Sequence, residues 1–212
     1  MPGQEQRVFY GGTTAGEIQD RSNSRIGTQF WANRGIAGRG ILIDYASYAD
    51  RKGIHFDTFS PHEIKLSEIQ EIVRECNITV QKGDILFMRV GITRAWDNTM
   101  TVAQKTDYAT KPIPQLAGVE PTVDMLRWLW DSGFAAVAGD SIAFEVWPPS
   151  NPEIMLHEYL LAGWGMPIGE LFDLERLAEK CKELNRWSFF ISSVPLNQKG
   201  GVSSPPSALA IF

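Results

Sequence analysis

The sequence predicts an α/β fold in a single domain of 212 residues. Short apolar runs bounded by glycine or polar segments are typical of buried strands, and they alternate along the chain with amphipathic helix patterns. No fixed repeat or low-complexity run divides the chain. With 43% hydrophobic and 21% charged residues, the composition is that of a globular domain that buries roughly 70% of its unfolded surface.

The first half of the chain contains two predicted strands with a predicted helix between them. Residues 38–46 (GRGILIDYA) and 82–91 (KGDILFMRVG) are apolar runs flanked by glycine. Residues 66–76 (LSEIQEIVREC) place their apolar side chains on one helical face. Ser67 and Gln70 have capping-box spacing, which predicts that this helix begins at Ser67.

The second half continues the alternation of helix and strand. The patterns predict a helix over 122–133, a strand and loop over 134–145, an extended segment over 166–172, a helix over 174–184 capped by Asp173, and a strand over 186–194. Two stretches lack periodicity, residues 1–35 and 94–121, and we expect both to be irregular. Asp44 and Asp140 each follow a predicted strand, where capping of a turn is favoured over a role in binding.

Charge and hydropathy exclude several classes of protein. A net charge of −5 and scattered basic residues leave no stripe that would bind a phosphate backbone, so we expect no nucleic-acid partner. No stretch approaches the roughly 18 apolar residues of a membrane span, and the sequence shows no secretory leader, so we expect a cytoplasmic protein. Cys76 and Cys181 lie in helical patterns and are expected to be structural thiols.

Four stretches carry a resemblance to a known family. WANRGIAGRGILIDYASYAD, FAAVAGDSIAFEVWPP, LHEYLLAGWGMPIGELFDLERLAE and GGVSSPPSALAIF occur in an order similar to that of the cyclase family, in its fungal branch, whose relatives include kynurenine formamidase and isatin hydrolase. The resemblance implies a swivelling β/β/α (cyclase-like) single domain with a mixed sheet. It also implies assembly into dimers or larger oligomers, and metal-dependent hydrolysis of amides and lactams.

The resemblance assigns a site to His157 and Glu170. In the family a histidine and a glutamate late in the chain join the metal centre, and these two positions match them. From the residues alone, a hydrogen-bonded core histidine and a buried glutamate remain the alternative to a metal pair. The pair also suits general acid/base catalysis, because histidine exchanges a proton near neutral pH.

The family's other metal ligands come from an early His-Gly-Thr-His segment followed by Asp and His, and the printed sequence does not contain that segment. Two ligands make a weak site, since a catalytic zinc needs about three. We therefore expect no cofactor, with Zn or Mn bound only if another subunit completes the site. His55, Asp57 and His62 have a superficially similar order, but they lie after the first predicted strand, where the family's ligands do not.

Aromatic residues near the matched motifs are candidates for substrate binding. Trp31, Trp147 and Trp164 lie in predicted loops and could line a pocket for a flat aromatic substrate, although most tryptophans serve packing. His62 is a further candidate, against the alternative of a hydrogen-bonded loop residue.

Three functional hypotheses remain open. The first is a metal-independent enzyme that catalyses cyclisation, isomerisation or dehydration of a small molecule in fungal specialised metabolism. The second is a metal-dependent amide or lactam hydrolase of the kynurenine formamidase type. The third is a non-catalytic binding subunit. As a separate expectation, the protein forms a homodimer or larger homo-oligomer, because surface that relatives cover would be exposed.

Overall fold

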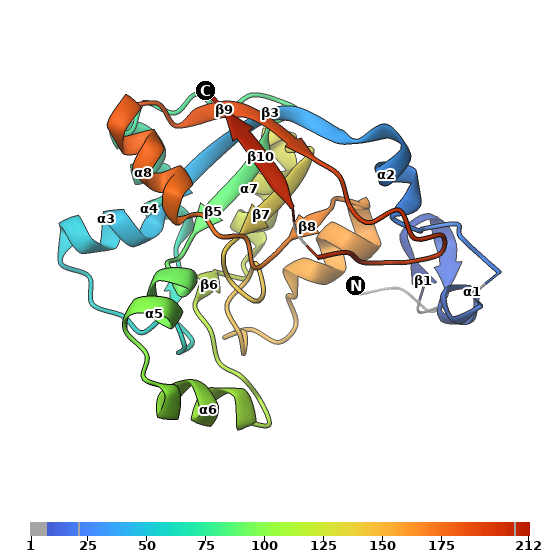
Figure 1. The fold of residues 1–212 in the computed structure, drawn as a ribbon, viewed down its shortest axis with the longest axis horizontal. Helices are drawn as coiled ribbons and strands as arrows, with labels where there is room; N and C mark the ends of the chain where they lie inside the picture. The colour runs from blue at the N-terminus through green and yellow to red at the C-terminus, as the bar shows by residue number, and fades with distance from the viewer. Residues whose placement is uncertain (1–7, 21, 206) are drawn as a thin grey trace.

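The computed structural model describes residues 8–20, 22–205 and 207–212, and a curled, six-stranded mixed sheet forms the centre of this part of the chain (Figure 1). In spatial order its strands are β10 (Ala208–Ile211), β9 (Ser188–Ser193), β3 (Ile36–Asp44), β5 (Ile85–Arg89), β7 (Ala136–Gly139) and β8 (Ile168–Gly169). The last four run parallel, while β9 is antiparallel to both β3 and β10. The predicted α/β class and mixed sheet are confirmed.

Shorter elements surround this sheet. Two small ladders pair β1 (Val8–Phe9) with β2 (Thr13–Thr14) and β4 (Glu63–Ile64) with β6 (Gly118–Val119). The α-helices are α1 (Ala15–Gln19), α2 (Gln29–Arg34), α3 (Tyr45–Lys52), α4 (Leu66–Glu75), α5 (Ile92–Asn98), α6 (Val102–Thr110), α7 (Val123–Ser132) and α8 (Glu175–Leu184). A 3-10 turn, η1 (Tyr10–Gly12), and a π-helix, η2 (Glu158–Trp164), complete the described elements. No described helix has the length and apolar character needed to cross a membrane.

The helix predicted to begin at Ser67 begins one residue earlier, and its cap is a different one. The Lys65 amide donates to the Glu68 carboxylate (2.8 Å), and the Leu66 amide donates to Glu120 (2.8 Å). These two carboxylates satisfy amides that the first helical turn leaves free. Glu120 lies 54 residues further along the chain than Leu66, so local spacing could not reveal its role.

The stretch 94–121 was expected to be irregular, and this expectation is wrong. It contains most of α5, all of α6, and β6. Thr101 and Gln104 form the capping box that starts α6: the Thr101 amide donates to Gln104 (2.9 Å) and the Gln104 amide donates to Thr101 (3.3 Å). The described part of 1–35 is likewise organised into short elements, while residues 1–7 and 21 lie outside the described residues.

One face of the central sheet is covered by α8 at one end and borders a cavity at the other. At the carboxyl ends of β3 and β5, α8 lies over the sheet, because Glu175 bonds to Arg89 (2.6 Å) and Lys182 lies near Asp44 (3.4 Å). Asp44 also pairs with Arg89 (2.6 Å) and accepts the Ser47 amide at the start of α3. Asp44 is therefore a structural residue. At the other end of this face, the sheet residues line a cavity.

Candidate active site

His157 lies between two carboxylates. Its Nδ1 bonds to Glu145 Oε2 (2.6 Å) and its Nε2 bonds to Glu170 Oε1 (3.1 Å). The backbone amide of His157 also donates to Glu145 Oε1 (3.1 Å). The sequence pair His157 and Glu170 is thus brought together, and both ring nitrogens are held in place.

Two unusual backbone features aim these side chains. His157 immediately precedes the π-helix η2, a wide helical form that occurs frequently at functional sites. Glu170 follows the short strand β8 and precedes Leu171, whose φ of 58° is uncommon for a residue other than glycine. The amides of Leu171 and Phe172 donate to Ser141 and Gly139, which fixes this turn.

Glu145 is the member of the site that sequence reasoning missed. Its side chain is 2% exposed, and it belongs to a segment paired with β6: the Val119 amide donates to Phe144 O and the Val146 amide to Val119 O, both at 3.0 Å. Buried glutamates are rare unless paired, so a glutamate between Phe144 and Val146 was the available signal.

Gly118 allows the backbone of Glu145 to approach this closely. A Cβ atom added to Gly118 would lie 2.4 Å from the carbonyl carbon of Glu145. We therefore expect Gly118→Ala to lower the free energy of unfolding by about 2–3 kcal/mol, because backbone must move to relieve the overlap. Gly38→Ala is the matched control in β3, where the nearest heavy atom would be 3.9 Å away. Equal urea midpoints for the two variants would contradict this expectation.

The electrostatics of the cluster favour a charged imidazole. Burial on its own lowers the pKa of His157, but the hydrogen bonds and charges of Glu145 and Glu170 outweigh burial and raise it to about 10. At neutral pH both ring N–H groups therefore donate, one to each carboxylate. His157 is 30% exposed and Glu170 31%, so the Glu170 side of the pair is open to a ligand.

A cavity of about 460 Å³ begins at this open side. Its floor is the sheet face described above, with Ile36, Phe87, Ala138 and Ile191 among the lining residues. Loop residues 202–205 also line the cavity. The volume is in the range of small-molecule sites in proteins.

The structure brings one of the four predicted substrate-binding residues to this cavity. Trp31 lines it and is 41% exposed. Trp147 packs instead beside a separate buried cluster around Tyr108, and Trp164 packs against Trp130 (ring centroids 5.0 Å apart). His62 bonds to Tyr45 Oη (2.7 Å) and stacks on Phe56, away from the cavity.

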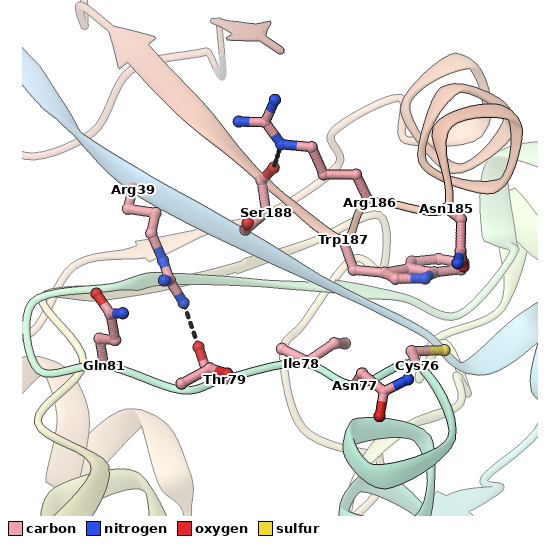
Figure 2. A pocket seen from close by; sticks show the side chains of 10 residues that line it. All are labelled: Arg39, Cys76, Asn77, Ile78, Thr79, Gln81, Asn185, Arg186, Trp187 and Ser188. Atoms are coloured by element: carbon pink, nitrogen blue, oxygen red, sulfur yellow. Dashed lines mark hydrogen bonds between the residues drawn. The ribbon is translucent and has the colours of Figure 1, made fainter.

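A second hollow, of about 330 Å³, lies between the segments that follow α4 and α8 (Figure 2). Its two arginines already have protein partners: Arg39 donates to Thr79 O and pairs with Asp84 (3.0 Å), and Arg186 donates to Ser188 O (3.0 Å). In Figure 2, Arg39 extends from β3 down to the loop that carries Thr79. Because both arginines already bond to other parts of the protein, they are less available to a ligand than His157 and Glu170 are in the other cavity.

The side chains present do not by themselves fit a metal centre. Within residues 8–20, 22–205 and 207–212, no group of three His, Cys, Asp or Glu side chains could hold a metal ion. Both nitrogens of His157 are bonded to carboxylates, so a metal would have to displace one of these bonds.

Similar solved structures agree with this fold. A novel cyclase is 26% identical with a TM-score of 0.80, over 98% of this chain and 64% of that one. An isatin hydrolase bound to the product analogue thioisatinate is 15% identical with a TM-score of 0.58, over 82% of this chain and 59% of that one. Isatin hydrolase A from Labrenzia aggregata, bound to benzyl benzoate, is 17% identical with a TM-score of 0.59, over 82% of this chain and 60% of that one. The chain thus spans between 59% and 64% of the length of these three proteins.

The likeness to the two isatin hydrolases concerns the fold alone at this identity. No protein of curated function matches the sequence. The model of a family described as putative cyclases matches residues 22–146, a range that contains Glu145 and ends before His157. Since this match covers more than half of the 212 residues, the chain belongs to the putative cyclase family.

Proposed function

We propose that this protein is a small-molecule enzyme that closes or opens a ring at a carbonyl group by general acid/base catalysis. The observation that carries the proposal is the position of His157, between Glu145 and Glu170 at the end of an apolar cavity. On the resemblance of the sequence motifs alone, we assign the reaction to fungal specialised metabolism.

Each member of the cluster has a role in the proposed reaction. Glu170 lines the cavity and acts as the base, taking the proton of an attacking hydroxyl group or water as its oxygen bonds to the carbonyl carbon. Once Glu170 has taken this proton it is neutral, which weakens its bond to Nε2 of His157 and frees that N–H group for the substrate. The carbonyl π electrons move to the carbonyl oxygen, where the freed N–H group of the His157 imidazolium stabilises the charge; in ring closure it then supplies a proton to that oxygen. Glu145 holds the imidazole in this orientation and is a positioning residue. Attack by a hydroxyl of the substrate closes a ring. After attack by water, the carbonyl double bond re-forms as the ring C–N or C–O bond breaks, and the departing ring atom takes the proton held by Glu170, which opens the ring.

The test measures turnover of a panel of lactams and lactones that includes isatin. His157→Asn and Glu170→Gln should each lower kcat by about 10²- to 10⁴-fold, because each removes one proton-transfer group. His55→Asn is the matched control, since His55 is exposed and lies outside the cavity. Activity should also fall as the pH approaches 10, where His157 loses its proton. Variants as active as wild type, or a wild-type rate equal to the uncatalysed rate throughout the panel, would contradict the proposal.

A metal-dependent hydrolase, as the resemblance implies, would need Zn or Mn ligands from another subunit. Elemental analysis and treatment with a chelator separate the two mechanisms. We expect substoichiometric metal and a melting temperature that does not change with the chelator. One metal ion per chain, with activity lost to the chelator and restored by that ion, would instead establish the metal-dependent mechanism.

A further inference from the structure

We infer that the cavity at His157 selects a neutral, flat and largely apolar substrate and rejects the corresponding carboxylate. This inference rests on the proposed function for the location of the reacting group. It adds the chemical class of the molecule, which the acid/base mechanism alone leaves open.

The charges around the cavity disfavour an anionic substrate. Among the described residues that line it, His157 and Glu170 are the only ones with an ionisable side chain, and no lysine or arginine is present. Glu145 lies directly behind His157. The cluster therefore holds two carboxylates against one imidazolium, and both N–H groups of that imidazolium are already bonded. An anionic substrate would meet excess negative charge and no free cation.

The apolar lining of the cavity also disfavours a charged substrate. Beyond His157 and Glu170, the surface consists of sheet residues such as Ile85, Phe87 and Ile191, together with Leu161 and other aliphatic side chains. A charge buried against such a surface without a partner is strongly unfavourable. Apart from the indole N–H of Trp31, the only other polar side chains lining the described cavity are hydroxyl groups, of Thr28, Ser193, Ser203, Ser204 and Ser207. Hydroxyl groups can bond a neutral carbonyl or hydroxyl of the substrate, but they cannot neutralise a carboxylate.

The residues that form the floor of the cavity favour a flat substrate. Ala136 and Ala138 of β7 point toward the cavity, and Gly169 of β8 pairs with Ala138. Small side chains on adjacent strands leave a flat stretch of floor against which a planar molecule can lie. Phe172 and Trp31 also line the cavity, and their rings can stack on a flat molecule.

The experiment compares two probes that share a ring system and differ in charge, 2-naphthamide and 2-naphthoate. Isothermal titration calorimetry at pH 7 should give a Kd for the amide at least about tenfold lower than for the carboxylate. Binding is measured without turnover, so its result is independent of the proton-transfer roles proposed above. If His157→Asn retains activity but the probe preference holds, the catalytic proposal fails while this inference stands.

A matched pair of variants tests whether the cavity itself makes the selection. Ser193 lines the cavity, whereas Ser192, the preceding residue of β9, points to the other sheet face and does not line it. Ser193→Arg should narrow or reverse the preference, because it places a cation in the cavity. Ser192→Arg adds the same charge outside and should leave the preference unchanged. Equal or tighter binding of 2-naphthoate by the wild type, or binding of neither probe up to its solubility, would overturn the inference.

Discussion

The stabilising effect of His157 should decline by on the order of 3 kcal/mol between pH 6.5 and 10. Burial lowers the pKa of this imidazole, but Glu145 and Glu170 raise it above the ordinary value of 6.5, to about 10. A folded-state pKa above the unfolded value means that the folded state holds the proton more tightly. The stabilisation is therefore complete below pH 6.5 and is lost as the pH rises toward 10.

Urea unfolding of wild type and His157→Asn at several pH values measures this effect. The difference in unfolding free energy between the two proteins should shrink steadily from pH 7.5 to pH 10. Other groups that titrate in this range, such as the thiols, are common to both proteins and cancel in the difference. Glu145→Gln should also weaken the pH dependence, because it removes one of the two carboxylates. A constant difference across this range would show that His157 is neutral in the folded protein.

Asp140→Ala should lower the free energy of unfolding by about 3–5 kcal/mol, the second large effect. The Asp140 side chain is fully buried and accepts the amides of Val90 (2.7 Å), Gly91 (2.7 Å) and Ile92 (3.1 Å). Alanine would leave these three buried donors without an acceptor. Burial raises the pKa of this carboxyl to about 6 against the opposing effect of the amides, so most of the group is ionised at pH 7.

Asp124→Ala is the control for the aspartate substitution. Asp124 is exposed at the start of α7 and pairs with Arg127, which is also exposed, so its loss should cost less than about 1 kcal/mol. Asp140→Asn should fall between the two, because one oxygen remains to accept an amide. If Asp140→Ala unfolds at the same urea concentration as Asp124→Ala, the three hydrogen bonds do not stabilise the fold.

Local patterns in the sequence predicted most of the elements that build the central sheet. The apolar runs at 38–46 and 82–91 contain most of β3 and all of β5, as predicted. Thr122 and Gly133, which were predicted to cap a helix, lie at the two ends of α7. These signals work because each depends on residues that lie next to one another along the chain. The capping box at Thr101 was equally local, and attention to its Thr-x-x-Gln spacing would have predicted α6.

The candidate site was predictable only in part, and distance along the chain explains why. His157 and Glu170 lie 13 residues apart, on a segment whose motif the resemblance covers. Glu145 reaches His157 only because β6 holds its segment in place, and no local pattern records that pairing. Trp147 and Trp164 lie near the same motifs in sequence, yet packing against other aromatic rings directs them away from the cavity.

The π-helix after His157 makes the site sensitive to length as well as to chemistry. A π-helix is equivalent to an α-helix with one residue added to a turn, and each residue of an α-helix turns the chain by about 100°. Loss of a single residue between Glu158 and Trp164 would convert this segment to ordinary helix and rotate everything after it relative to His157. Glu170 would then no longer face the imidazole, although every reacting side chain would still be present. The number of residues in one short helix thus matters to this site as much as their identity.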